Sequence, residues 1–210
     1  MKRTKEDALI TKNRIIDKAV ELFLENGFSN TTLNQIAQKA GVTRGAIYWH
    51  FKDKLDIIND LLDQHSSSLS EIIQSVLAKE ISEFAKIVEI VEKVVDNFFN
   101  NHSFRDFIKL TWFKMEYTNL QAATEPKEEF LEYFIHIIEE LVKTAQRNGT
   151  IKNKFNALTI SLTITNQIIG MYRLHFIIPN YMNRQYALDT LRSYLSLLKN
   201  VLSDHTNNYN

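Results

Sequence analysis

Residues 42–54 read Val-Thr-Arg-Gly-Ala-Ile-Tyr-Trp-His-Phe-Lys-Asp-Lys and predict a short helix over about residues 44–50. Thr43 can cap its start, because a threonine hydroxyl accepts a hydrogen bond from a free amide of the first turn. Ile47 and Phe51 lie four residues apart on one face. The other face carries two aromatic rings, a glycine and a lysine, which a short helix rarely exposes together unless something large lies against it.

The residues before this helix complete a helix-turn-helix. A first helix is predicted over about residues 7–26, with Gly27 as its left-handed cap. The run Thr32-Leu33-Asn34-Gln35 matches a capping box, so a second helix begins there. Gly41 then turns the chain toward the third helix. In such a motif the third helix is the one that can enter the major groove of DNA.

The start of the third helix carries side chains suited to that groove, where base edges are distinguishable. Arg44 can donate two hydrogen bonds to a guanine, and Ala46 can touch a thymine methyl group. Gly45 has no side chain, so the backbone can come close to the DNA. Thr32 and Thr43 place helix N-termini, whose free amides favour anions, at the phosphate backbone. These five residues are therefore predicted DNA contacts.

Motifs on both sides of Gly41 resemble the tetracycline-repressor (TetR) family of bacterial transcription regulators, over about residues 14–54. The matching motifs are Phe23 to Phe28 with Gly27, Ile36-Ala37 with Ala40-Gly41-Val42, and Tyr48-Trp49-His50-Phe51 followed by Lys54. Residues 41–54 are most similar to the subgroup that represses multidrug and acridine efflux pumps. The resemblance implies an all-α protein of about nine helices, with a three-helix DNA-binding domain followed by a helical ligand-binding and dimerisation domain.

Four more residues receive DNA-binding roles from this resemblance. Tyr48, Trp49 and His50 occupy positions where family members usually hold phosphates or bases, and Lys54 resembles a phosphate clamp. Tyr48 or Trp49 taken alone would more often lie in a core, but their common placement opposite Ile47 reverses that preference. His50 is evenly balanced between a phosphate contact and a packing role.

The composition fits a helical protein for which no metal or cofactor is expected. The 210 residues include 5 Gly and 2 Pro, so helix breakers are few, and no Cys. The charged start lacks the apolar stretch of a signal peptide, and no apolar run approaches the roughly 20 residues of a membrane span. A cytoplasmic protein without membrane contact is expected. Residues 1–54 hold ten Lys or Arg against six Asp or Glu, which places the basic surplus at the predicted DNA end.

Further helices are predicted over about residues 54–78, 81–100, 104–121, 126–148, 155–177 and 184–204. Residues 158–165 alternate apolar and polar side chains, which alone is a strand signal. A lone strand would find no partner strand in this chain, and the family implies helices here. We therefore expect a helix, on which small or polar side chains form a stripe that would let another helix approach closely: Thr159, Thr163, Asn166 and Gly170.

A homodimer is expected, because one monomer reads too few bases to find a site in a genome. In the family the last two helices, here about 155–177 and 184–204, form the dimer as a four-helix bundle. Five leucines at three- and four-residue spacing suit this interface, with an internal core face as the alternative: Leu188, Leu191, Leu195, Leu198 and Leu202.

Aromatic residues are frequent over residues 84–176, where the family usually binds a small molecule. Aromatic rings with a few polar groups are what such a pocket needs. The predicted ligand-binding residues are Trp112, Phe113, Glu116, Tyr117, Gln167 and His175. Glu116 with the neighbouring rings could receive a cationic drug. The alternatives are ordinary core for any one aromatic and a solvated or paired state for the glutamate.

We therefore predict a DNA-binding domain over residues 1–54 and a ligand-binding and dimerisation domain over 55–210. The predicted function is a repressor that binds a palindromic double-stranded DNA operator as a homodimer. A small hydrophobic or cationic molecule would release it, and a drug efflux pump is a candidate target. The alternative is a regulator of this type that acts as an activator or senses a partner protein or metabolite. An enzyme is disfavoured, since the chain has no Gly-rich phosphate loop, no nucleophile elbow and no Cys.

Overall fold

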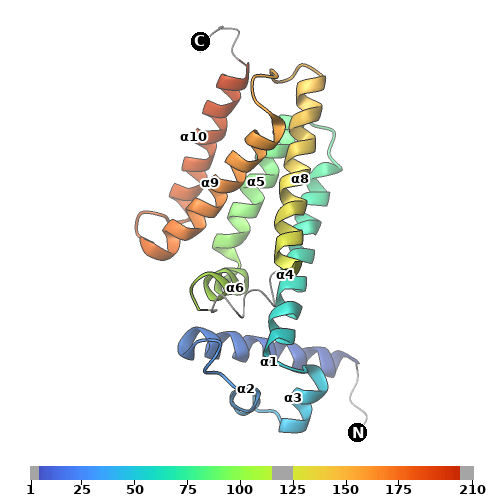
Figure 1. Ribbon diagram of the computed structural model, residues 1–210, viewed down its shortest axis with the longest axis vertical. Helices are drawn as coiled ribbons and strands as arrows, with labels where there is room; N and C mark the ends of the chain where they lie inside the picture. The colour runs from blue at the N-terminus through green and yellow to red at the C-terminus, as the bar shows by residue number, and fades with distance from the viewer. Residues whose placement is uncertain (1–4, 115–124, 204–210) are drawn as a thin grey trace. The chain divides into compact units, whose positions relative to one another are not determined.

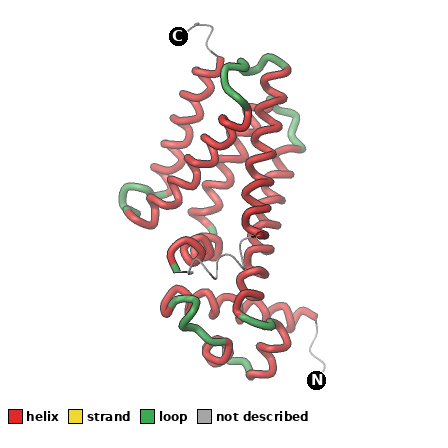
Figure 2. Tube along the Cα trace, in the orientation of Figure 1, coloured by secondary structure: helices red, strands yellow, loops and turns green. Residues whose placement is uncertain are grey.

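The computed structural model describes residues 5–114 and 125–203, and every regular element in those ranges is an α-helix (Figure 1, Figure 2). The helices are α1 (Lys5–Asn26), α2 (Leu33–Lys39), α3 (Arg44–His50), α4 (Lys54–Leu77), α5 (Glu83–Asn100), α6 (His102–Phe113), α8 (Glu125–Arg147), α9 (Ala157–Ile177) and α10 (Arg184–Ser203). None of these described helices is both long and apolar enough to cross a bilayer. The all-α prediction is confirmed.

The chain divides into two compact units. One comprises Met1–Ser67 with Asn101–Glu129, and the other comprises Ser68–Asn100 with Phe130–Asn210. The division falls within α4 rather than after residue 54, because the first half of α4 and all of α6 pack with α1 to α3. The functional division into 1–54 and 55–210 stays a prediction.

The first unit is built on α1, which packs against α2 and α6, while α2 packs against α3. Apolar side chains from all of them are removed from water, which is the main favourable term in folding. The ammonium of Lys12 on α1 is paired with the carboxylate of Asp60 on α4. The fully buried side chains of this core include Ile15, Ala19, Phe23, Ile36, Ile47 and Ile57.

The second unit is arranged around α5, which packs against α9 and α10. The second half of α4 contributes Ile73 and Val76, both fully buried. Hydrogen bonds link the helices across this core. Ser161 on α9 donates to the carbonyl of Ile135 on α8, at 2.7 Å. The amide of Lys152 donates to the carbonyl of Leu202, at 2.8 Å, and ties the loop after α8 to α10.

Residues 158–165 are helical, as expected, despite their strand-like alternation. On a helix the isoleucines at 160, 164 and 168 fall on one face, and all three are buried. The hydroxyls find partners within the helix, since Thr163 donates to the carbonyl of Thr159 at 2.7 Å. Burial of the isoleucines that recur every fourth residue therefore favours a helix here, although the alternation of every second residue is typical of a strand.

Candidate nucleic-acid interface

Two side-chain caps fix the helix-turn-helix in the first unit. Thr32 caps α2 and forms a complete capping box with Gln35, as predicted. Gly41 has φ of 63°, a left-handed conformation that glycine adopts without the steric penalty other residues meet. Thr43 Oγ1 accepts a hydrogen bond from the amide of Ala46, at 3.2 Å, and so caps α3. The chain between the two helices is therefore held by local hydrogen bonds.

The two faces of α3 differ sharply in exposure. Ile47 is fully buried, whereas the side chain of Trp49 is 73% exposed and that of Tyr48 is 48% exposed. Gly45 is exposed, and a Cβ built there meets no atom within 4 Å. Packing inside the protein therefore does not require glycine at this position. The expected exposure of the aromatic face is confirmed, and its solvent-facing rings are available to an external partner.

Side chains on α3 also order one another. The guanidinium carbon of Arg44 lies 5.8 Å from the ring centroid of Tyr48. The rings of Trp49 and His50 meet edge to face, with centroids 4.5 Å apart. His50 is half-buried, so part of its role is to position the indole. Its predicted contact with DNA stays a prediction, as do those of the other α3 residues.

Lys54 holds the loop between α1 and α2. Its ammonium donates to the carbonyls of Phe28 at 2.6 Å and Ser29 at 3.3 Å, and lies 4.6 Å from the Phe28 ring centroid. These loop contacts could not be predicted from local sequence, because they join residues 26 and 25 positions apart. The phosphate role of Lys54 stays a prediction, and replacing it would also loosen this loop.

Several basic groups of the first unit are already paired with carboxylates. Lys39 lies 3.0 Å from Glu25 and 3.3 Å from Glu21. The hydrogen bond that the Lys39 ammonium donates to the Glu25 carboxylate is the largest cause of the raised pKa of Lys39. Lys18 is also paired with Glu21. The positive charge available to phosphates is thus smaller than the basic surplus of residues 1–54 suggests, and the exposed Arg44 becomes more important.

The predicted ligand-binding residues are distributed over both units. Trp112 is half-buried and Phe113 exposed at the end of α6, in the first unit. Gln167 and His175 are half-buried on α9, in the second unit. Glu116 and Tyr117 lie outside the described residues. A pocket that combines all six stays a prediction.

His175 belongs to a cluster of rings in the second unit. Its Nδ1 lies 2.8 Å from the carbonyl oxygen of Met182. The Phe98 and Tyr172 rings are stacked, with centroids 4.0 Å apart, and the Tyr172 hydroxyl donates to the carbonyl of Val94 at 2.9 Å. Burial raises the pKa of Tyr172. His175 packs against the rings of Phe98 and Phe99 in this cluster, with centroid distances of 5.5 and 5.1 Å, and its predicted contact with a ligand stays a prediction.

His65 on α4 is a buried residue that the sequence reasoning did not single out. Its ring packs against those of Phe104 and Phe107 on α6, with centroid distances of 5.3 and 5.4 Å. Burial lowers its pKa to about 4, and a hydrogen bond with Ser103 acts in the opposite direction. Its position four residues after Leu61 and four before Leu69, on the apolar face of α4, could have indicated its burial.

The exposed faces of α9 and α10 carry the features expected of a helix-helix interface. All four members of the small and polar stripe on α9 are exposed: Thr159, Thr163, Asn166 and Gly170. The leucine row of α10 is different, because Leu188, Leu191, Leu195 and Leu202 are buried within the chain. The alternative of an internal core face is therefore correct for these four. The exposed apolar side chains of α10 are instead Tyr186, Leu197 and Val201.

Comparison with known proteins identifies the class of this chain. Residues 15–61 match the family model described as "Bacterial regulatory proteins, tetR family". The chain is 29% identical to the "Probable acrEF/envCD operon repressor" of Escherichia coli K12 over 203 residues, covering 96% of this chain and 89% of that protein. It is 41% identical to the "Uncharacterized HTH-type transcriptional regulator TtgW" of Pseudomonas putida over 93 residues, covering 44% of this chain and 69% of that protein.

A solved structure has the same architecture over nearly the whole chain. NalD, the secondary repressor of the MexAB-OprM multidrug efflux pump in Pseudomonas aeruginosa, superposes with a TM-score of 0.77 at 27% sequence identity. The alignment covers 92% of this chain and 97% of NalD. The family match falls on α1 to the first half of α4, where the capped helices and the exposed rings lie. The chain belongs to the tetR family of bacterial regulatory proteins.

Proposed function

We propose that this protein is a DNA-binding transcriptional repressor that binds a palindromic operator as a homodimer and is released by a small molecule. The observation that carries the proposal is the exposure of Trp49 and Tyr48 on a helix whose opposite face is buried through Ile47. Exposed aromatic area of this size is costly in water unless a partner covers it. Such a regulator would work in the cytoplasm, where bacterial DNA lies.

The DNA contacts would come from the nine residues predicted from the sequence. Arg44 would donate to a guanine, and each good bidentate contact contributes ~1–3 kcal/mol of discrimination. Ala46 would face a thymine methyl group across the space that Gly45 leaves open. Phosphates would be held by the capped helix starts at Thr32 and Thr43 and by Lys54. Phosphates or bases would be held by Tyr48, Trp49 and His50.

The homodimer would form through α9 and α10. The small side chains on α9 allow a close helix approach, while Tyr186, Leu197 and Val201 on α10 offer apolar area that association would remove from water. Two recognition helices would then lie ~34–36 Å apart, one turn of DNA. Sedimentation of the Leu197→Glu variant tests this interface, since a buried charge at each copy should shift the dimer toward monomer.

Release by a small hydrophobic or cationic molecule would follow a shift between two states, of which only one holds the recognition helices at operator spacing. The names of two relatives support the repressor role, since the E. coli protein is named as a probable operon repressor and NalD as the secondary repressor of a multidrug efflux pump. Trp112, Phe113, Glu116, Tyr117, Gln167 and His175 are the proposed contacts. A drug efflux pump is accordingly the proposed target.

DNA binding can be measured with Trp49 as the reporter. The chain has two tryptophans, so Trp112→Phe leaves Trp49 as the only one. Addition of an operator duplex should change the Trp49 emission and protect it from iodide quenching. A scrambled duplex at the same salt concentration is the control. If no duplex protects Trp49, the DNA-binding proposal fails.

The ligand-release proposal needs a separate measurement. Candidate drugs are titrated into the operator complex at constant salt, and fluorescence anisotropy follows the DNA. Release by hydrophobic cations supports the drug-responsive repressor. Binding that tightens instead favours the alternative, an activator, and response only to a partner protein or a metabolite favours a different sensor. DNA binding without any response to small molecules would remove the induction proposal alone.

A further inference from the structure

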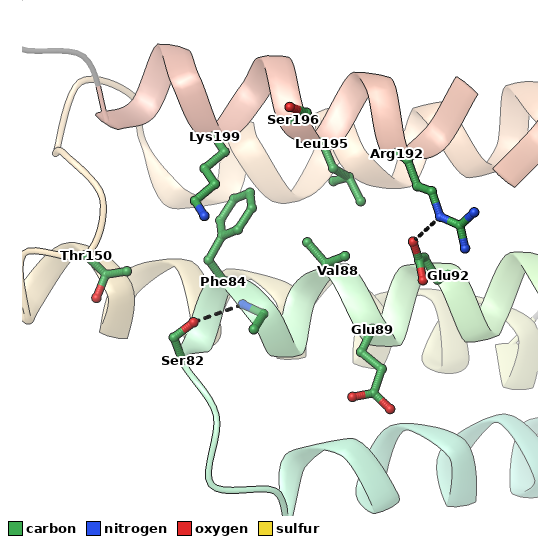
Figure 3. Close-up of a pocket in the computed structure, with 11 residues that line it drawn as sticks. Ser82, Phe84, Val88, Glu89, Glu92, Thr150, Arg192, Leu195, Ser196 and Lys199 are labelled. Carbon is green, nitrogen blue, oxygen red and sulfur yellow. Dashed lines mark hydrogen bonds and ion pairs between the residues drawn. The ribbon is translucent and has the colours of Figure 1, made fainter. Parts of the chain in front are cut away.

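A groove between α5 and α10 has no role in the function proposed above. It has a volume of about 450 Å³ and lies entirely within the second unit (Figure 3). Its apolar lining includes Phe84 and Val88 from α5, with Leu195 from α10. Volumes of this order are typical of sites for small molecules. The four predicted inducer contacts that the structure describes do not line it: Trp112, Phe113, Gln167 and His175.

The ammonium of Lys199 lies at one end of the groove. Lys199 extends from α10, and its ammonium lies 5.8 Å from the centroid of the Phe84 ring. In the part of the chain that the structure describes, no carboxylate pairs with Lys199. The charge is therefore held over an aromatic surface at the edge of the groove and can receive an anion.

The acidic side chains of the lining are already neutralised. Glu92 is bonded to Arg192 at 2.7 Å, and Glu89 to Lys79 at 2.6 Å and Lys93 at 3.3 Å. Figure 3 shows the Glu89 carboxylate directed away from α10. The Lys79 hydrogen bond is the first cause of the lowered pKa of Glu89, so this carboxyl stays ionised and paired. Neither acid competes for Lys199.

A hydroxyl group, that of Ser82, lies at the same end of the groove as Lys199 (Figure 3). Ser82 Oγ accepts a hydrogen bond from the amide of Ala85, at 3.3 Å, which leaves its own hydrogen available as a donor. An ammonium with a hydroxyl donor suits a carboxylate, and the neighbouring apolar floor suits a hydrocarbon body.

We propose that this groove binds a small carboxylate with an apolar or aromatic body. The carboxylate lies at Lys199 and Ser82, and the body covers Phe84 and Val88. The proposed dimer surface uses Tyr186, Leu197 and Val201, which lie on another flank of α10, so a dimer leaves the groove open. The ligand joins α5 to α10 and therefore stabilises the second unit.

Binding is tested on the full-length protein with 6-fluoro-2-naphthoate as the probe, followed by ¹⁹F NMR. Saturable line broadening is expected with the wild-type protein. Lys199→Gln should weaken binding about tenfold, because it removes a charge-assisted hydrogen bond. Ala85→Phe places a ring in the groove and should abolish saturable binding. Lys109→Gln removes an exposed charge on α6, outside the groove, and should leave binding unchanged.

The neutral analogue 6-fluoro-2-naphthalenemethanol separates the carboxylate from the apolar body. It should bind the wild-type protein more weakly than the acid and be insensitive to Lys199→Gln. Absence of saturable binding by the acid overturns the proposal. Binding that Ala85→Phe and Lys199→Gln both leave intact also overturns it, since the probe then occupies another site such as the proposed inducer pocket. Circular dichroism of each variant verifies that it is folded.

Discussion

The aromatic side chains of α3 and those around Phe98 have the same chemistry and opposite surroundings. Trp49 is 73% exposed, whereas Phe98 is fully buried and stacks on Tyr172. Both sets consist of aromatic rings on amphipathic helices, so the hydrophobicity of the side chains does not explain why one set is exposed and the other buried. What distinguishes them is whether another helix of the same chain covers the ring. Exposed rings on a rigid, capped helix therefore indicate an external partner, and buried rings indicate stability.

The largest expected difference between the two regions is in the free energy of unfolding. Phe98→Ala should lower it by about 3–5 kcal/mol, because a fully buried ring leaves a cavity among the surrounding rings. Trp49→Ala should change it by less than about 0.5 kcal/mol, as is usual for surface substitutions, while weakening operator binding. Urea unfolding at one fixed protein concentration provides the measurement. Equal destabilisation by the two variants would contradict the assignment of Trp49 to binding and of Phe98 to stability.

The buried ring of His65 is expected to stabilise the first unit, as Phe98 stabilises the second. Burial lowers the pKa of His65 from its ordinary value of 6.5 to about 4 in the folded protein. The buried, neutral His65 ring contributes to the free energy of unfolding. This contribution is fully present above pH 6.5 and is lost as the pH falls from 6.5 toward 4, because His65 takes up a proton in the unfolded chain at a higher pH than in the folded protein. The loss is on the order of 2–3 kcal/mol.

The variant His65→Gln isolates this effect. Stability of the wild-type protein and the variant is compared by urea unfolding at several pH values between 4 and 7. The difference between their free energies of unfolding should shrink with falling pH, since only the wild-type protein has His65 to protonate. A difference that is constant over this range would mean that His65 is protonated alike in both states.

Arg44 sharpens the role of the exposed region. Arg44→Ala should relax discrimination between operator sequences by about 1–3 kcal/mol while preserving the fold. Lys52→Ala, which removes an exposed charge just after α3, should weaken binding to all sequences alike and reduce the salt slope by about one. Anisotropy titrations with single-base operator variants at two or more salt concentrations measure both. A uniform loss for Arg44→Ala would assign this residue to the phosphates instead.

Local signals were sufficient for the helix-turn-helix and for most helices. The helix predicted over 104–121 is the exception, because α6 ends at Phe113 and residues 115–124 lie outside the described residues. Thr32 and Gln35 carry a capping box in the sequence and form it in the structure. Thr43 caps α3 as predicted. These features depend on residues three positions apart, so neighbouring letters contain the information. The exposure of Trp49 also followed from a local argument, its placement opposite Ile47.

Contacts between distant residues could not be read in the same way. The leucines of α10 revealed an apolar face, but not that Leu191 and Leu195 are buried within the chain rather than against a second copy. The loop contacts of Lys54 and the groove beside Lys199 likewise depend on partners far away in sequence. The periodicity of apolar residues predicts which face of a helix is buried. Only the three-dimensional structure shows which other helix packs against that face.

A pair of tyrosines provides the finest test of the two environments. Tyr172→Phe removes a buried hydroxyl that donates to the carbonyl of Val94 and should lower the free energy of unfolding by about 0.5–1.5 kcal/mol. Tyr48→Phe deletes the same atom from a half-exposed ring and should leave stability unchanged while weakening operator binding. Thermal unfolding and anisotropy on both variants measure the four values. The chemical change is identical in the two variants, so any difference between them comes from the surroundings of the ring. Loss of stability in Tyr48→Phe, or loss of DNA binding in a folded Tyr172→Phe variant, would show that the two regions do not have separate functions.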